Sequence, residues 1–340
     1  MAITAFVTGA TGFIAQHIVL QLLQDGYRVI GSVRSIEKGE SLVKIFSNNN
    51  FTYEVIESFE KAGAIDEALK KHPEVTIFLH TASPVVIGSG VENIEKDILV
   101  PAIQGTEFVL RSIKQFSPQI ERFVFTSSIV ATATVAEVTS TDFKGGESTW
   151  NSLTYEQSKD DPLSAYCGAK KFAEKAVFEF VEKENANFTV SSIIPVFVFG
   201  TLNRYLRTKN MNESAKIVSN ILDLEPNQDV PQFQGNFIDV RDVAQAHIRA
   251  FKSPEAQGKR FVLGSRYFNN QLLLDIVRKN FPQISSKLPI GVPISTDSTY
   301  KWSVDDRNAR NILGLEYVTL EKSIVDSINQ LSKSHPKFQE

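Results

Sequence analysis

The sequence predicts an α/β protein with a doubly wound parallel sheet and a smaller C-terminal α/β lobe. Short apolar runs rich in β-branched residues alternate with stretches of helical periodicity from residue 2 to residue 195. Such alternation is typical of the strand–helix–strand units of a parallel sheet. A glycine-rich turn at residues 9–15 joins the first strand to the first helix, and the alternation weakens after Gly200. We therefore expect a main domain followed by a second lobe.

The length of the chain supports this division. At 340 residues the chain is long for a single hydrophobic core. We expect residues 1–195 and about 235–265 to form the main domain. The smaller lobe is expected to contain about residues 196–234 and 266–340.

Composition and charge exclude several classes of protein. A hydrophobic content of 42% and a charged content of 22% are ordinary for a soluble globular chain. The formal net charge of -3 gives no electrostatic reason to expect a nucleic acid or an anionic membrane as a partner. No apolar run reaches the roughly 18 residues that a membrane-spanning helix needs. The N-terminus lacks a basic segment, so we expect no signal peptide.

Cysteine and histidine usage points to a reducing compartment and to no metal. The single cysteine, Cys167, cannot form an internal disulfide, which fits a cytoplasmic setting. We interpret Cys167 as a small helix residue and not as a nucleophile. The five histidines show no short ligand spacing, so no metal site is expected.

The elements of the main domain follow from periodicity. Strands are expected at residues 2–8, 27–33, 51–56, 75–80, 122–126 and 188–194. Helices are expected directly after the glycine turn, at residues 94–116 and at residues 164–184. Residues 132–163 are polar and aperiodic, and this stretch is long enough to fold over a site.

The elements beyond residue 195 are less regular. A turn is expected at residues 195–200, and a helix at residues 214–222. A strand leads into a helix within residues 237–244, and another short strand covers residues 260–263. Three further helices are expected at residues 270–280, 305–313 and 320–331.

The glycine-rich turn is suited to bind a dinucleotide. Gly9 permits the turn, Gly12 lets the backbone approach a pyrophosphate, and the small Ala15 allows the helix to pack close to the strand. Free amides and the positive end of the helix dipole then face the phosphates. The other contacts expected here are Thr11, Phe13 and Ile14. The turn predicts a Rossmann-type domain.

The end of the second strand identifies the dinucleotide. A site selective for NAD has an acidic side chain about twenty residues beyond the glycine turn, where it binds the ribose 2′-hydroxyl. This chain has Arg34 there, followed one helical turn later by Lys38. Two cations are suited to a 2′-phosphate. The sequence therefore predicts NADPH/NADP+ as cofactor.

The ends of the next two strands predict further contacts with the cofactor. Ser58 and Phe59 follow the third strand and are expected to border the adenine. Thr81, Ala82 and Ser83 follow the fourth strand. Because the carboxyl ends of parallel strands meet at one edge of the sheet, these residues are expected near the cofactor.

Tyr166 and Lys170 are the candidates for proton transfer. They lie four residues apart in a stretch with a helical apolar stripe, so the phenol and the ammonium share one face of a helix. We expect the ammonium to lower the pKa of the phenol from about 10 toward the working pH. Ser128, at the carboxyl end of the fifth strand, offers a hydroxyl to hydrogen-bond a carbonyl oxygen.

The same spacing occurs at two other places. Tyr155 and Lys159 belong to a polar connection that stops before a proline, and Tyr205 and Lys209 belong to a basic run. A basic run is most often a solvated face. Only Tyr166 has a packed scaffold around it.

Together these motifs resemble the extended short-chain dehydrogenases/reductases, and within them the NADPH-dependent methylglyoxal and aldehyde reductases related to dihydroflavonol reductases. The resemblance covers nearly the whole chain. It is carried by the Gly9-x-x-Gly12-x-x-Ala15 turn, His80-Thr81-Ala82-Ser83-Pro84, Thr126-Ser127-Ser128, Tyr166-x-x-x-Lys170, Pro195-Val196-Phe197-Val198-Phe199-Gly200 and Phe237-Ile238-Asp239-Val240-Arg241-Asp242-Val243-Ala244.

The resemblance implies roles for several residues. Ser128 is then the catalytic serine, Tyr166 donates the proton, and Lys170 lowers the pKa of the tyrosine and holds the nicotinamide ribose. Pro195 and Val198 would contact the nicotinamide. Ser214 would lie near the cofactor, and Arg34 and Lys38 would bind the 2′-phosphate.

Three positions depart from the pattern of the family. Ser58 stands where relatives often have an aspartate, Ile194 replaces an asparagine, and Ile129 stands where an aromatic residue is frequent. These departures bear on adenine binding and on the shape of the substrate pocket. The pocket is expected to be apolar and lined by Val85, Val86, Ile129 and Phe197, with Trp150 nearby.

The expected activity is the NADPH-dependent reduction of aldehydes and ketones, including α-ketoaldehydes and aryl ketones. One alternative is an epimerase or dehydratase of nucleotide sugars, with Arg204, Arg207 and Lys209 binding a diphosphate. Another is a non-catalytic protein that responds to NADP(H). By analogy with relatives, the helices at residues 94–116 and 164–184 could pair across a homodimer.

Overall fold

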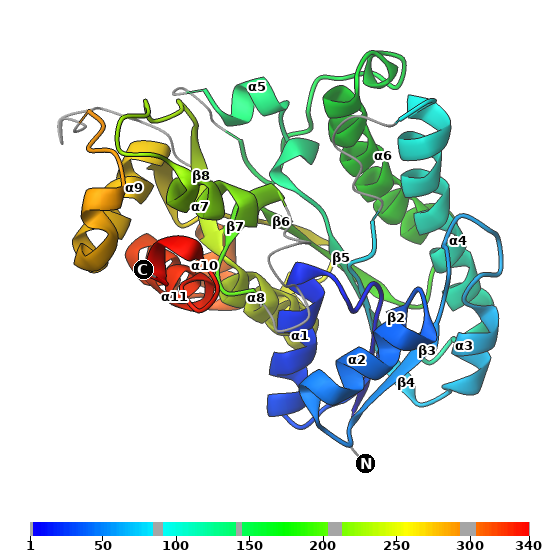
Figure 1. Ribbon diagram of the computed structural model, residues 1–340. Coiled ribbons are helices and arrows are strands. Elements are labelled where there is room, and N and C mark those ends of the chain that lie inside the picture. Colours follow the sequence, from blue (N-terminus) through cyan, green and yellow to red (C-terminus); the bar gives the residue numbers. More distant parts are fainter. Residues whose placement is uncertain (1–2, 84–90, 141–144, 203–212, 293–303, 340) are drawn as a thin grey trace.

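A seven-stranded parallel sheet forms the centre of the computed structural model (Figure 1), which describes residues 3–83, 91–140, 145–202, 213–292 and 304–339. Every pair of neighbouring strands in this sheet runs parallel. In sheet order the strands are β3 (Phe51–Val55), β2 (Arg28–Val33), β1 (Thr4–Val7), β4 (Val75–His80), β5 (Arg122–Thr126), β6 (Thr189–Pro195) and β9 (Lys259–Leu263). The predicted doubly wound α/β fold is confirmed.

Helices cover both faces of this sheet. On one face lie α1 (Phe13–Gln24), α2 (Ile36–Phe46) and α8 (Val240–Lys252). On the other face lie α3 (Asp66–Lys71), α4 (Val100–Phe116) and α6 (Pro162–Lys183). Alternate residues of β1 serve the two layers, because Ala5 and Val7 pack with α1 whereas Phe6 packs with α4. A strand buried on both faces is nearly all apolar, as this one is.

The predicted helix at residues 94–116 begins with a wider turn. Glu95–Leu99 (η1) is π-helical and continues into α4. Pro101 lies in the first turn of α4, where its ring lacks an N–H and crowds the preceding carbonyl groups. A π-helical turn accommodates this without ending the helix.

A second, three-stranded sheet contains β7 (Phe197–Phe199), β8 (Gln234–Asp239) and β10 (Arg266–Asn269), in the order β10-β8-β7. The turn expected at residues 195–200 was wrong for residues 197–199, because these residues form the strand β7. Phe199 packs against Phe268 at 4.7 Å between ring centroids and stacks on Phe237 at 5.8 Å, and these contacts hold residues 197–199 as a strand. The neighbouring helices are α7 (Glu213–Asp223), α9 (Asn270–Asn280), α10 (Arg307–Leu313) and α11 (Leu320–Leu331).

The two sheets share one continuous hydrophobic core. Buried residues from α1 through β7, β8 and α8 to α11 form a single cluster. β9 belongs to the central sheet, while β8, which precedes it in the chain, belongs to the smaller sheet. The division of the chain into a cofactor-binding domain and a substrate-binding lobe stays a prediction.

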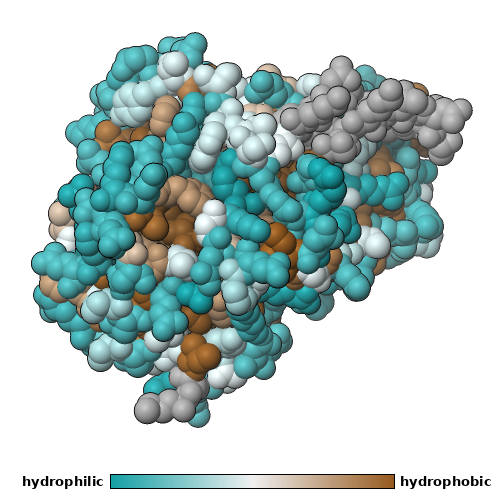
Figure 2. Space-filling view, turned by 180° about the vertical axis from the view of Figure 1, so that it is seen from behind, coloured by the Kyte–Doolittle hydropathy of each residue, from teal (hydrophilic) through white to brown (hydrophobic). Residues whose placement is uncertain are grey.

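The surface contains both hydrophilic and hydrophobic residues. Seen from behind, hydrophilic residues cover most of the molecule and hydrophobic residues show in small separate groups (Figure 2). None of the helices in the described ranges is long and apolar enough to cross a membrane. The same part of the chain contains no group of three or more His, Cys, Asp or Glu side chains that could hold a metal ion.

Candidate active site

A pocket of about 360 Å³ opens at the carboxyl ends of β5 and β6. This end of a parallel sheet is where ligands bind in doubly wound folds. The pocket gathers residues from the ends of strands, from α1, α6 and α7, and from the smaller sheet. Among the residues predicted from the sequence, it is lined by Ile14, Thr81, Ser83, Ser128, Ile129, Tyr166, Lys170, Pro195, Phe197, Val198 and Ser214.

Helix α6 places Tyr166 and Lys170 in this pocket. Asp161 is the N-cap and accepts hydrogen bonds from the amides of Leu163 and Ser164 at 2.8 and 3.0 Å, and Pro162 occupies the first helical position. This combination starts a helix firmly. Tyr166 and Lys170 follow within the first turns on the same face.

The three candidate catalytic residues lie together. The Tyr166 hydroxyl lies 3.5 Å from Ser128 Oγ, to which it donates a long hydrogen bond. Lys170 Nζ donates to the backbone oxygen of Thr126 at 3.4 Å. Lys170 is 7% exposed, so its ammonium is largely removed from solvent.

The electrostatics of Tyr166 differ from the expectation. Burial raises the pKa of the Tyr166 phenol, and its hydrogen bond with Ser128 opposes that rise. The lowering of this pKa by Lys170 is not seen in the structure. Burial lowers the pKa of Lys170 itself to about 8, against the raising effect of the Glu174 charge. Tyr166 is therefore a protonated phenol at neutral pH, and Lys170 is a cation that loses its proton easily.

The hydroxyl groups at the end of β5 each have a separate partner. Thr126 Oγ1 lies 2.7 Å from His247 Nε2, and Ser127 Oγ donates to Glu174 at 2.6 Å. His247 Nδ1 lies 2.8 Å from the backbone oxygen of Val243 and so carries the proton, which leaves Nε2 to accept from Thr126. These bonds tie the turn that carries Ser128 to α6 and α8.

The glycine-rich turn has the geometry that the sequence predicts. Gly9 has a φ of +64°, and a Cβ atom on it would lie 3.1 Å from Ala82 Cα. Gly12 is the N-cap of α1 and provides no side-chain cap. The first helical bond runs from the amide of Gln16 to Gly12 O at 3.0 Å, so the amides of Phe13 and Ile14 lack partners within the helix. The positive end of α1 is open to an anion.

A threonine holds this turn against the one after β4. Thr8 Oγ1 accepts from the amides of Thr81 and Ala82, both at 3.0 Å, and so donates its own proton to His80 Nδ1 at 3.0 Å. Burial lowers the pKa of His80 to about 3, with the Lys170 charge adding to the effect. His80 is therefore a neutral acceptor. Thr8 and His80 keep two of the predicted cofactor segments in register.

Arg34 and Lys38 lie at the end of β2 and in the first turn of α2. Arg34 is exposed and Lys38 half-buried. Among the described residues, neither side chain forms an ion pair or a hydrogen bond. Both cations are free to meet an external anion.

The predicted adenine border follows β3. Ser58 Oγ accepts a hydrogen bond from the Glu60 amide at 3.1 Å and so stabilises the local turn. The Phe59 ring packs edge-on against His80 at 5.9 Å. Phe59 is half-buried.

Comparison with known proteins gives the family. The profile of the 3-beta hydroxysteroid dehydrogenase/isomerase family matches residues 6–272. The chain belongs to this family of extended short-chain dehydrogenases/reductases.

Reductases of yeasts are similar to this chain over nearly its whole length. The NADPH-dependent methylglyoxal reductase of Saccharomyces cerevisiae is 39% identical, over 97% of this chain and 98% of the relative. The structure of Gre2 with NADPH from Candida albicans shares 40% identity and a TM-score of 0.92, covering 98% of this chain and 99% of that one. The NADPH complex of the yeast methylglyoxal/isovaleraldehyde reductase shares 38% identity and a TM-score of 0.90, covering 97% of this chain and 98% of that one.

Most of the pocket wall around Tyr166 is apolar. Ile129 lines it although only 3% of its surface is exposed, whereas Ile194 is fully buried within β6 and is not among the lining residues. Trp150 stacks against the Arg260 guanidinium at 3.7 Å and does not line the pocket. Val85 and Val86 lie outside the described residues.

Sequence reasoning missed part of this wall. The further apolar lining residues are Val130, Val135, Val138, Leu163, Val196 and Phe233. Val135 and Val138 belong to α5 (Val135–Val138), a short helix within the stretch predicted to be aperiodic. Thr134 and Glu137 form a capping box there, and the Thr-x-x-Glu spacing was a signal that could have revealed this helix.

The other Tyr–Lys pairs lie elsewhere. Lys159 Nζ lies 4.9 Å from the centre of the Tyr155 ring and forms ion pairs with Glu95 and Glu156, both at 3.0 Å. This pair does not line the pocket. Tyr205 and Lys209, with Arg204 and Arg207, lie outside the described residues.

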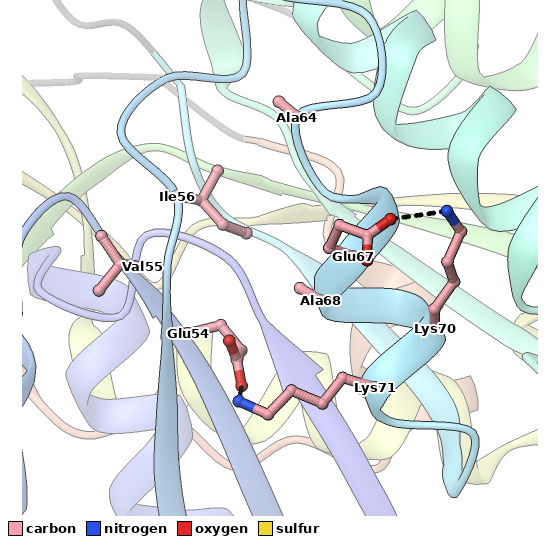
Figure 3. A pocket seen from close by; sticks show the side chains of 8 residues that line it. All are labelled: Glu54, Val55, Ile56, Ala64, Glu67, Ala68, Lys70 and Lys71. Atoms are coloured by element: carbon pink, nitrogen blue, oxygen red, sulfur yellow. Dashed lines mark hydrogen bonds and ion pairs between the residues drawn. The ribbon is translucent and has the colours of Figure 1, made fainter.

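A second hollow, of about 460 Å³, lies between β3 and α3 (Figure 3). Its charges neutralise one another, since Lys70 pairs with Glu67 at 2.7 Å and Lys71 pairs with Glu54 at 2.5 Å. The hollow shares no lining residue with the pocket of Tyr166. We therefore assign the candidate chemistry to the pocket of Tyr166.

Proposed function

We propose that the protein is an NADPH-dependent carbonyl reductase that converts aldehydes and ketones to alcohols. The observation that carries this proposal is the meeting of Ser128, Tyr166 and Lys170 in one apolar pocket at the carboxyl end of the sheet. The yeast relatives and their NADPH complexes support it. Methylglyoxal-like α-ketoaldehydes, aliphatic aldehydes and aryl ketones are the proposed substrates.

The residues present fit NADPH. The uncapped start of α1 suits the pyrophosphate, and a side chain at Gly12 would come within 3.2 Å of Gly9 O. Arg34 and Lys38 would hold the 2′-phosphate, and Lys170 the nicotinamide ribose. The remaining proposed contacts are Gly9, Thr11, Phe13, Ile14, Ser58, Phe59, Thr81, Ala82, Ser83, Pro195, Val198 and Ser214.

The chain supplies proton transfer and orientation. When bound, NADPH supplies the hydride that reduces the carbonyl carbon. Tyr166, protonated at neutral pH because burial raises its pKa, donates its proton to the carbonyl oxygen. Ser128 donates a hydrogen bond to the same oxygen. The cation of Lys170 favours the phenolate that remains after the transfer.

The apolar wall selects the substrate. The space next to Tyr166 is surrounded by the apolar side chains of Ile129, Val135, Val138, Phe197 and Phe233. Such a wall binds the alkyl or aryl part of a carbonyl compound by burying apolar surface. It offers few polar partners to a sugar, so a nucleotide-sugar epimerase or dehydratase is disfavoured.

A cofactor assay tests this function. NADPH absorbance should fall when the enzyme is mixed with isovaleraldehyde, methylglyoxal or an aryl ketone, and the matching alcohol should form. Isovaleraldehyde and the aryl ketone should show a lower KM than methylglyoxal because they bury more apolar surface. If NADPH absorbance does not fall with any carbonyl of the panel, the proposal is contradicted and a non-catalytic NADP(H)-binding protein is favoured.

The pH dependence of the reaction should have an upper limit set by Lys170. Burial lowers the pKa of Lys170 to about 8, so the cation is present at pH 7 and is lost as the pH rises through that value. The kcat/KM for NADPH reports the free enzyme and should fall about tenfold per pH unit above the limit. A profile that stays level to about pH 10 would contradict this assignment of the cation.

We also propose a cytoplasmic location and a homodimer. The single cysteine, Cys167, is buried and has no second cysteine with which to pair, which suits a reducing compartment. α4 and α6 lie side by side on the outer face of the sheet (Figure 1), where a second copy could pack against them. Light scattering on the purified protein would give the oligomeric state.

A further inference from the structure

Glu174 is a fully buried carboxylate behind the candidate active site. It lies on α6, one helical turn beyond Lys170, and is 0% exposed. Its oxygens accept a hydrogen bond from Ser127 Oγ at 2.6 Å and two from Arg260, at 2.9 Å from Nε and 3.1 Å from Nη2. A buried charge needs such partners, because an unpaired one would be strongly destabilising.

Arg260 is itself held in place. Its Nη1 donates to the backbone oxygens of Glu147 and Thr149 at 2.6 and 2.7 Å, and its guanidinium stacks on Trp150 at 3.7 Å. The side chain of Arg260, which lies on β9, is 10% exposed. The carboxylate of Glu174 therefore has a fixed position relative to β9.

Ser127 connects this ion pair to the catalytic turn. Its side chain is bound by Glu174, and its amide donates to the Ile193 oxygen of β6 at 2.8 Å. Ser128 is the next residue. The turn is thus held from α6 and from β6, and the same helix α6 carries Tyr166 and Lys170. This connection joins the turn that carries Ser128 to the helix that carries Tyr166.

We propose that Glu174, anchored by Arg260, is a positioning residue for the reaction: through Ser127 it sets Ser128 against Tyr166, and its buried carboxylate, one helical turn from Lys170 on α6, provides a counter-charge to that ammonium. The inference rests on the proposed carbonyl reduction. Glu174 lies outside the pocket and touches neither the carbonyl nor the cofactor in this assignment.

The groups around Lys170 make Glu174 the important charge. On α6 the other titratable neighbours are Tyr166 and Cys167, which burial keeps neutral by raising the pKa of each, and Lys171, whose ammonium donates to the backbone oxygens of Asn151 and Leu153. Two histidines on other elements lie near Lys170: His80 at the end of β4, and His247 on α8, which contacts Thr126. Burial lowers the pKa of His80 to about 3 and that of His247 to about 4, so both are neutral. Glu174 is the charge that raises the pKa of Lys170 against the effect of burial.

Two substitutions separate the two effects. Glu174→Gln keeps an oxygen for Ser127 but removes the charge, so the upper limit in the pH profile of kcat/KM for NADPH should move to lower pH by roughly half a unit or more. Ser127→Ala keeps the charge but frees the turn, so kcat should fall roughly tenfold, with the pH limit and the KM for NADPH unchanged.

Matched control variants show how much activity is lost when any buried polar side chain is replaced. Asp242→Asn replaces another buried carboxylate, which accepts from the Val318 amide at 2.9 Å, and Ser191→Ala removes another buried hydroxyl, which donates to Ala256 O at 2.7 Å. Both controls should leave kcat and the pH limit unchanged. Thermal melts of all four variants show which of them fold.

A direct titration makes the test independent of turnover. NMR of protein labelled with ¹⁵N-lysine, with Lys170 assigned through Lys170→Met, should show a lower pKa of Lys170 in Glu174→Gln than in the wild type. If wild type reduces no carbonyl but this shift is seen, the proposed function fails and the charge effect stands. An unshifted Lys170 in Glu174→Gln, or a kcat in Ser127→Ala equal to that of Ser191→Ala, would overturn the inference.

Discussion

Replacing Tyr166 by phenylalanine should lower kcat for carbonyl reduction by about 10²- to 10⁴-fold, which is the range of positioned proton transfer. The hydroxyl that is removed makes one long hydrogen bond, at 3.5 Å to Ser128, so its loss should cost little stability. Because the ring remains, the pocket keeps its shape. The measurement is kcat with isovaleraldehyde, together with NADPH affinity from the quenching of protein fluorescence, which should be unchanged.

Tyr155→Phe is the matched control for this prediction. It removes a phenol at the same Tyr-x-x-x-Lys spacing, but Tyr155 lies outside the pocket and packs edge-on against Phe172 at 5.6 Å. Its kcat should equal that of wild type. Full activity in Tyr166→Phe, or equal losses in both variants, would show that the proton comes from another group.

The double substitution Arg34→Ala and Lys38→Ala should weaken NADPH binding on the order of 10²-fold, because each charge-assisted bond to a phosphate contributes about 1.5–3 kcal/mol. NADH lacks the 2′-phosphate, so its affinity should stay the same. Neither cation has a partner within the described part of the chain, and the substitution therefore breaks no internal ion pair. The measurement is the ratio of the two dissociation constants in wild type and variant.

Lys44→Ala provides the control for charge on the same helix. Lys44 is exposed in the last turn of α2, at the end opposite to Lys38. The Lys44→Ala variant should keep the preference of the protein for NADPH over NADH. A parallel weakening of NADH and NADPH in the double variant would place the two cations away from the 2′-phosphate.

The motifs that the sequence reveals depend on near neighbours in the chain. The glycine turn can be recognised because Gly9 must adopt a positive φ and Gly12 must leave the start of α1 open, and both needs are visible within a few residues. The choice of Tyr166 over Tyr155 followed from the apolar stripe of one helix. Capping and periodicity are local, so sequence alone reveals them.

The errors and omissions concern contacts between distant segments. β7 was predicted to be part of a turn because its pairing with β8 joins residues far apart in the chain. Phe233 reaches the pocket from the connection that leads into β8, and no local pattern indicates it. The expected lowering of the pKa of Tyr166 considered only Lys170 on the same helix, whereas burial by the surrounding elements has the larger effect.

The sequence by itself determined the parallel α/β fold, the glycine turn, the cations suited to a 2′-phosphate and the Tyr166–Lys170 pair. The tertiary structure decided which side chains surround that pair: the partners of Thr8, the ion pair of Glu174 with Arg260, and the protonation of Tyr166 and Lys170. The physical reason is that helix caps, turns and periodicity depend on neighbouring residues, whereas burial and charge depend on every segment that packs around a group.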